Sequence, residues 1–260
     1  MANLEVIARV RVRPGQLDGV KAQAAEILRV TRELDTQTLR CDWFLNEDET
    51  ECEVHELFPD EQGLIEHNLH IMQLRTILFR DYAYDHRSAL YGEVSENFLN
   101  LVKARMGAAP TVFSFLQGIE QPARMAPYEG GYGTAAKADL ELHAHLRIRP
   151  GLLEGFKAQA AEILRLTRQK DTHTLRYDWF LNEDGTECEV HEAYLSGEGL
   201  IEHNANVLEA RALLFEKYAY DHRMTAFGDV SEELRELADK HAGGIAVCSF
   251  FQGFAVAPAA

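Results

Sequence analysis

The chain has no run of 18 or more apolar residues, so the sequence predicts no transmembrane helix. Positive charge is also scarce, because 26 Lys and Arg stand against 42 Asp and Glu, for a formal net charge of −16. Nucleic acids and anionic membranes attract positively charged surfaces, so we expect neither as a partner. Only four of the 260 residues are Cys, and the first residues lack the basic and apolar regions of a signal peptide. We therefore expect reduced thiols and a cytoplasmic protein.

Several motifs that carry familiar chemistry are missing as well. The sequence contains no G-x-G-x-x-G, no P-loop, no C-x-x-C and no H-E-x-x-H, so it gives no sign of a nucleotide cofactor or of a common zinc site. Its content of 46% hydrophobic and 26% charged residues is that of an ordinary globular protein.

The chain contains a long internal repeat. Residues 4–105 recur as residues 140–241, at a constant shift of 136 positions. Three segments are unchanged between the copies: KAQAAEILR begins at Lys21 and Lys157, DWFLNED at Asp42 and Asp178, and TECEVHE at Thr50 and Thr186. Two units of this size indicate a duplicated domain, because solenoids need three or more short units. Any functional site should therefore occur twice, unless one copy has drifted.

The hydrophobic period changes in the same order in both copies. In the first copy, apolar residues alternate along residues 6–12 and follow a helical face from residue 17. Two strands are predicted at residues 38–45 and 51–58, a second helix from Asp60 to about Tyr82, and a short strand at 88–92. Ser95 is a typical N-cap for a third helix, and residues 111–117 are predicted to form a closing strand. This β-α-β-β-α-β order predicts an α+β, ferredoxin-like domain with one bare sheet face.

We predict three segments along the chain: a first copy at residues 1–120, a linker at 121–139 and a second copy at 140–260. The linker is rich in Gly, Ala and Pro. If the bare sheet faces of the two copies pack on each other, the chain forms an intrachain dimeric α/β barrel, or pseudo-dimer. A homodimer of such pseudo-dimers is an alternative.

The pattern from Pro14-Gly15 through the first helix and the hairpin to His67 resembles the antibiotic biosynthesis monooxygenase family. The matching positions of the second copy are Pro150-Gly151 and His203. The resemblance implies two fused ferredoxin-like domains. It also implies oxygenation of small aromatic, phenolic or quinol-type substrates, with molecular oxygen as co-substrate and neither metal nor flavin as cofactor. Heme-degrading relatives of this fold use an inward Asn on the first strand, which neither copy has, so heme is disfavoured.

The resemblance and the residue pattern together give the candidate catalytic residues, Glu56 and His67, and their counterparts Glu192 and His203. Glu56 shares a strand face with Cys52, Val54 and Phe58, and His67 shares a helical face with Leu64. Both polar groups should therefore point between the helices and the sheet. There a carboxylate that orients an imidazole makes it a general base. The alternative is a buried His–Glu pair with a purely structural role.

Other residues near the expected pocket are candidates for substrate binding. An indole can stack on a flat substrate, although an aromatic residue among leucines at period two is more often core. AYDHR is also identical in both copies, at 83–87 and 219–223, and we expect it at a helix end, with its Asp and Arg as an ion pair. The candidate binding residues are Trp43, Trp179, Asn68, Asn204, Phe58, Tyr194, His86 and His222.

A metal site is a less favoured alternative. The first strand of the second copy carries Glu141, His143 and His145 on one face, and His173 and His191 occur on later strands. Because the first copy has no such histidine pair, the site would be unique to the second copy. We favour solvated or interface histidines there and expect no metal.

The expected function is base-assisted proton removal from an electron-rich aromatic substrate, whose anion then reduces O₂ in a pocket that excludes water. Two other functions stay open. One is a non-catalytic module that binds a small molecule, and the other is an isomerase or decarboxylase that uses the same His base.

Overall fold

The computed structural model describes residues 3–106, 110–119, 139–228, 230–232, 234–236 and 244–255, and within these the side chains of 105, 106 and 255 are not described. The described residues divide into two compact units. Unit 1 contains residues 3–112 and 248–255, and unit 2 contains residues 113–119 and 139–247. The predicted linker lies outside the described residues except for Asp139.

Unit 1 is built from the first copy of the repeat. Its elements are β1 (Leu4–Val12), α1 (Leu17–Leu34), β2 (Arg40–Asn46), β3 (Glu51–Phe58), α2 (Glu61–His70), α3 (Met72–Ile77), the π-helical turn η1 (Leu78–Tyr82), β4 (Ala83–Tyr91) and α4 (Glu96–Met106). The antiparallel pairs β4–β1, β1–β3 and β3–β2, together with the pairing of β2 with β10 (Ala246–Ala255), form its sheet.

Unit 2 repeats this order with fewer breaks. Its elements are β6 (Leu140–Ile148), α5 (Leu153–Lys170), β7 (Thr174–Asn182), β8 (Glu187–Tyr194), α6 (Gly197–Lys217) and β9 (Ala219–Gly228). The antiparallel pairs β9–β6, β6–β8 and β8–β7, together with the pairing of β7 with β5 (Thr111–Gly118), form its sheet. The expected class of fold, helices on one face of an antiparallel sheet, is confirmed for each unit.

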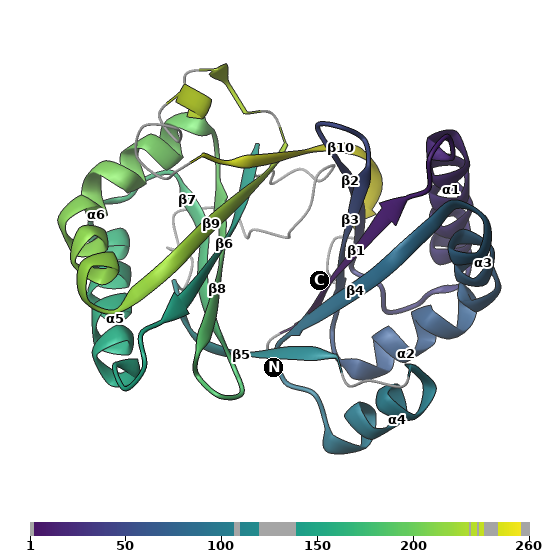
Figure 1. Ribbon diagram of the computed structural model, residues 1–260, viewed down its shortest axis with the longest axis horizontal. Helices are drawn as coiled ribbons and strands as arrows, with labels where there is room; N and C mark the ends of the chain where they lie inside the picture. Colours follow the sequence, from purple (N-terminus) through teal and green to yellow (C-terminus); the bar gives the residue numbers. More distant parts are fainter. Residues whose placement is uncertain are drawn as a thin grey trace. The chain divides into compact units, whose positions relative to one another are not determined.

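The core of each unit lies between its sheet and its helices, which cover one face of the sheet (Figure 1). In unit 1 the apolar stripe of α1, which includes Val20, Ala24 and Ile27, packs on alternate residues of the strands, such as Trp43 and Val54. Alternation of side chains along a strand puts one set of residues on this face. The predicted inward set of β3 is thus confirmed.

The last strand of each copy lies in the unit built from the other copy. β5 (Thr111–Gly118) pairs with β7, and β10 (Ala246–Ala255) pairs with β2. The predicted copies, 1–120 and 140–260, describe the sequence, whereas each compact unit contains the closing strand of the opposite copy. Hydrophobic alternation identifies a strand but does not say which neighbour it pairs with. The predicted packing of the two copies as a barrel stays a prediction.

The second predicted helix ends at Tyr82, as expected, but it is not one continuous helix. The segment breaks at Ile71, whose φ of −93° and ψ of 1° leave the helical region, and the chain continues as α3 and η1. AYDHR was expected at the helix end, but it begins β4, which is longer than the predicted 88–92 strand. The polar residues of AYDHR hid the strand, because β4 bulges there and loses its regular alternation. The Ser95 N-cap is confirmed, since its hydroxyl accepts a hydrogen bond from the N–H of Phe98 at 3.1 Å.

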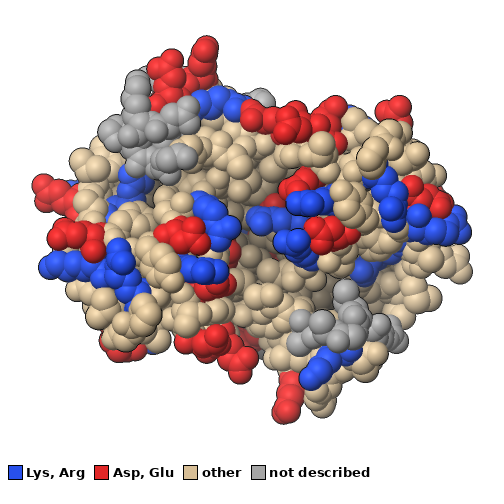
Figure 2. Space-filling view, in the orientation of Figure 1, with Lys and Arg blue, Asp and Glu red and all other residues tan. Residues whose placement is uncertain are grey.

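Acidic and basic side chains are interspersed over the face of the molecule in Figure 2. Some of them form exposed pairs on the strands, such as Arg11 with Glu51 and Arg87 with Asp85. None of the helices described is long and apolar enough to cross a membrane. The four cysteines are buried and free.

Candidate functional site

A cavity of about 440 Å³ lies in unit 1 between the sheet and the helices. This volume is within the usual range for small-molecule sites. Most of its wall is apolar and comes from β1–β4, α1, the α2–η1 segment and α4. The polar side chains that reach it are Glu56, Asn68, Arg75, Thr76, His86 and Ser88. The predicted location of a pocket, between helices and sheet, is therefore matched in this unit.

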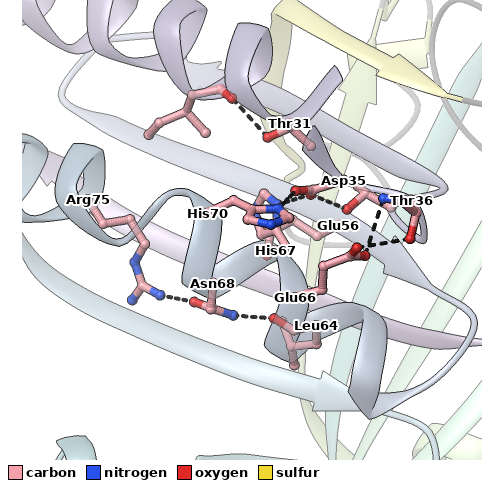
Figure 3. A network of polar contacts seen from close by, with 12 residues as sticks. Thr31, Asp35, Thr36, Glu56, Leu64, Glu66, His67, Asn68, His70 and Arg75 are labelled. Carbon is pink, nitrogen blue, oxygen red and sulfur yellow. Dashed lines mark hydrogen bonds and ion pairs between the residues drawn. The ribbon is translucent and has the colours of Figure 1, made fainter. Parts of the chain in front are cut away.

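His67 lies beside the cavity, not in its wall, and both of its ring nitrogens contact carboxylates (Figure 3). Nδ1 is 2.7 Å from Oδ2 of Asp35, and Nε2 is 3.1 Å from Oε1 of Glu56. The other oxygen of Asp35 lies 2.6 Å from Nδ1 of His70. Asp35 occupies the C-cap position of α1, so the network ties α1, α2 and β3 together.

This network favours the charged form of His67. Burial of the ring opposes protonation, but the neighbouring Glu56 and Asp35 carboxylates outweigh it and raise the pKa of His67 to about 9. A neutral imidazole has a single N–H, whereas an imidazolium donates from both nitrogens. The ring is thus placed to donate to both carboxylates near neutral pH. Of the two residues His67 and Glu56, Glu56 is the one that lines the cavity, and its side chain is 14% exposed.

Asn68 and Arg75 form a second polar group in the cavity wall. The amide nitrogen of Asn68 donates to the Leu64 carbonyl at 2.8 Å, and its oxygen accepts from Nη1 of Arg75 (Figure 3). The guanidinium also lies over the ring of Phe79, 5.9 Å from its centroid. Burial lowers the pKa of Arg75, although a guanidinium keeps its charge in proteins. Arg75 on α3 and Phe79 on η1 both line the cavity.

His86 reaches the cavity from β4, on the same strand face as Ser88 and Leu90, and the strand bulges beside it. Arg9 faces Arg87 and Arg11 faces Tyr84, so two residues of β4 lie opposite one residue of β1. The first of the two, Asp85, has a left-handed φ of 52°, which costs free energy in a residue other than Gly. Burial, and then the charge of Arg75, lower the pKa of His86 to about 4. His86 is therefore neutral near pH 7.

Trp43 lines the cavity, as predicted for a wall residue, and also belongs to the core cluster of unit 1. Phe58 lies behind the cavity, with its ring centroid 5.6 Å from that of His67. In unit 1 the structure thus brings Trp43, Glu56, Asn68 and His86 to one cavity and places Phe58 and His67 next to it.

Unit 2 differs around its candidate pair. Nδ1 of His203 lies 2.7 Å from Oδ2 of Asp171, as in unit 1. Glu192, however, accepts a hydrogen bond from the hydroxyl of Tyr194 at 2.7 Å. Burial raises the pKa of Glu192, which is only 8% exposed. His203 packs edge-on against Tyr177, with centroids 4.6 Å apart.

The remaining candidates of unit 2 follow the pattern of the first. The oxygen of Asn204 accepts from Nη1 of Arg211. Burial, followed by the charges of Arg211 and His145, lowers the pKa of His222 to about 4. Trp179 is 1% exposed and lies within the core of unit 2.

The metal candidates in unit 2 already have protein contacts. His143 and His191 face each other on β6 and β8, and their rings stack with centroids 4.0 Å apart. Nδ1 of His145 lies 2.8 Å from Oε1 of Glu189. His173 is away from this group and pairs with Glu202 at 3.2 Å.

Sequence reasoning missed two residues of the unit 1 site, Asp35 and Arg75. Asp35 follows α1, outside the strand and helix faces from which the site was predicted, whereas Arg75 lies on the same predicted helical face as Asn68 and Ile71. Both recur unchanged, as Asp171 and Arg211. The sequence did offer one signal for them: both are charged residues that are identical in the two copies.

No family model and no curated protein matches the chain. Among solved structures, a protein of Fusobacterium nucleatum described as "putative monooxygenase" matches with a TM-score of 0.58 and 10% identity, over 85% of this chain and 89% of its own. One of Lactobacillus acidophilus with the same description matches with a TM-score of 0.56 and 9% identity, over 86% and 92%. An antibiotic biosynthesis monooxygenase is 24% identical over 35% of this chain and 99% of its own, with a TM-score of 0.32. The first two likenesses show that the chain shares the mixed α/β fold of those proteins.

Proposed function

We propose that the unit 1 cavity is the active site of a cofactor-independent monooxygenase acting on a small aromatic, phenolic or quinol-type substrate. One observation carries this proposal: an otherwise apolar cavity of about 440 Å³ has Glu56, Arg75 and His86 in its wall. A flat apolar ring fits such a wall, and the polar side chains supply a proton acceptor and a positive charge. The monooxygenase descriptions of the two matched proteins agree with this reading.

In the proposed reaction the substrate loses a proton from an acidic O–H or C–H group to a base in the cavity wall. The guanidinium of Arg75, held by Asn68, stabilises the resulting anion, since fixed charges act strongly where water is excluded. The anion supplies the electrons that reduce O₂. For a methylene carbon next to an electron-rich ring, the balance is R₂CH₂ + O₂ → R₂C=O + H₂O, so that one oxygen atom enters the product and the other leaves as water. The electrons come from the substrate, so no cofactor is needed.

His86 is our proposed base, with Glu56 as a second proton acceptor. A base has to be unprotonated and within reach of the substrate, and His86 is neutral near pH 7 and lines the cavity. His67 was expected to be the base. Because its nitrogens contact Asp35 and Glu56, we propose that it is a positioning residue that holds the Glu56 side chain in place.

We also propose that the chain arose by duplication of one ferredoxin-like domain, with copies at residues 1–120 and 140–260 joined by the linker 121–139. The repeat in the sequence and the common order of strands and helices in β1–β4 and β6–β9 support this origin.

The test is oxygen uptake by the full chain with a panel of one-ring and two-ring phenols and hydroquinones, corrected for uptake without protein. We expect uptake that falls at least about 100-fold in His86→Ala, as for removal of a general base, and that falls in Arg75→Gln. The matched control is His173→Ala, at an exposed histidine outside the cavity. Binding without uptake would support the non-catalytic module instead. Turnover without oxygen would support the isomerase or decarboxylase.

A further inference from the structure

The two copies differ at two positions of the unit 1 core cluster that contains the cavity-wall residue Trp43. Residue n of the first copy corresponds to residue n + 136 of the second, so Val20 becomes Phe156 and Cys41 becomes Tyr177. Phe156 and Tyr177 both pack edge-on against Trp179, with centroids 5.8 and 5.6 Å away. Trp179 corresponds to Trp43, which lines the cavity in unit 1. Two additional aromatic rings thus lie against the equivalent of a cavity wall.

The candidate carboxylate of unit 2, Glu192, also has a different hydrogen-bond partner. Phe58 of the first copy is replaced by Tyr194, whose hydroxyl donates to Glu192 at 2.7 Å. Tyr194 and Phe156 are fully buried, and Tyr177 is buried as well. In unit 1 the corresponding Glu56 lies in the cavity wall and contacts His67. Glu56 is therefore open to a ligand in unit 1, whereas its counterpart Glu192 accepts a hydrogen bond from Tyr194 in unit 2.

The helices that follow the third strand of each copy also differ between the units. In unit 1 the segment after β3 is broken into α2, α3 and η1, and residues of all three pieces line the cavity. In unit 2 the corresponding segment is the single helix α6, Gly197–Lys217. A continuous helix packs regularly, whereas a π-turn inside a helix is frequent at functional sites.

From these three differences we infer that the chain has one working small-molecule cavity, in unit 1, and that Phe156 and Tyr177 fill its counterpart in unit 2. Unit 2 keeps the Asp171–His203 and Asn204–Arg211 pairs as structural links between its elements. The chain would then bind one ligand molecule, although its sequence contains the candidate site residues twice. This inference concerns the volume that is available to a ligand in each unit, so it holds whether or not the cavity catalyses oxygenation.

Xenon is a suitable probe because it enters apolar cavities whatever their natural ligand is. Crystals of the full chain would be pressurised with xenon and the anomalous signal located in each unit. We expect xenon between the sheet and the helices of unit 1 and none at the equivalent place in unit 2. Xenon at that place in unit 2 of the wild type, or none in unit 1, would overturn the inference.

Variants in which the residues at these two positions are exchanged between the copies give a second test, beside the result for the wild type. Val20→Phe/Cys41→Tyr should remove xenon from unit 1, and Phe156→Val/Tyr177→Cys should add a xenon site in unit 2. Thermal unfolding shows whether each variant is folded. Should the unit 2 variant fail to fold, the filling variant of unit 1 still tests the role of these two positions. Xenon retained in unit 1 of that variant would contradict the inference.

Discussion

Oε1 of Glu56 on β3 lies 3.1 Å from Nε2 of His67 on α2. The other nitrogen of this ring is bonded to Asp35, so the imidazole lies between two carboxylates, and its side chain is 1% exposed. A buried charge is stable only when it is paired, and here the three groups depend on one another. Stability and pH dependence of unit 1 should both follow from this arrangement.

Replacing His67 should destabilise unit 1 strongly. In His67→Ala the Asp35 and Glu56 carboxylates lose their shared partner, and breaking a buried ion pair typically costs about 3–5 kcal/mol. Urea unfolding followed by tryptophan fluorescence measures the loss. His173→Ala, in which the replaced ring is 48% exposed, should change stability by less than about 0.5 kcal/mol. Equal effects of the two substitutions would show that the network contributes little.

The contribution of His67 should depend on pH in the alkaline range. Its folded-state pKa of about 9 lies above the ordinary value of about 6.5. The stabilisation by the charged ring is therefore complete below pH 6.5 and is lost as the pH rises through 9. The stability difference between the wild type and His67→Gln should shrink between pH 7 and 10. A difference that instead grows over this range would mean that the ring is neutral in the folded protein.

Arg75→Gln should raise the pKa of His86. Burial is the first cause of the low value of about 4, and the charge of Arg75 is the second, so its removal should move the titration part of the way toward 6.5. Titration of the histidine ring signals by NMR measures the shift directly. His222, which has the equivalent neighbour Arg211 in unit 2, is the internal control and should not move. If His86 is the base, the acid limb of kcat/KM should move with its pKa.

The bulge of β4 should tolerate few residues at position 85. Asp85 has a φ of 52°, and Asp85→Val should cost about 1–2 kcal/mol because a branched side chain is strained there. Asp85→Asn should be nearly neutral, since Asn adopts this conformation readily. Thermal unfolding compares the two variants. A Val variant as stable as the Asn variant would show that the strand can lose the bulge without cost.

The thiols should be unreactive in the folded protein. All four are buried and free, and burial raises the pKa values of Cys41, Cys52 and Cys188 well above the usual range. Because the thiolate is the nucleophile, a disulfide reagent at pH 8 should label none of them quickly, and all four should react in denaturant. Rapid labelling of one thiol before unfolding would reveal a local opening.

Much of the fold follows from the sequence because the strands and α1 have clear periods and the repeat shows each pattern twice. The inward position of Glu56 and His67 follows from the same periods. The bulge at Asp85 and the break at Ile71 could not be predicted, since each depends on tertiary packing that overrides the local pattern. Arg75 and His86, which line the cavity, lie close to these two irregularities. The protonation state of His67 was also hidden, because it depends on Asp35, a residue 32 positions away in the chain.

The crossed pairing of β5 with β7 and of β10 with β2 has a consequence for how this gene can change. A fragment cut at the segment between the copies would carry a β-strand that it cannot use and would lack one that it needs, exposing an unpaired sheet edge. In this chain, therefore, deleting either copy would remove a strand from the sheet of the other unit. Even if only one of them handles a ligand, both contribute to the folded chain, because each completes the other's sheet.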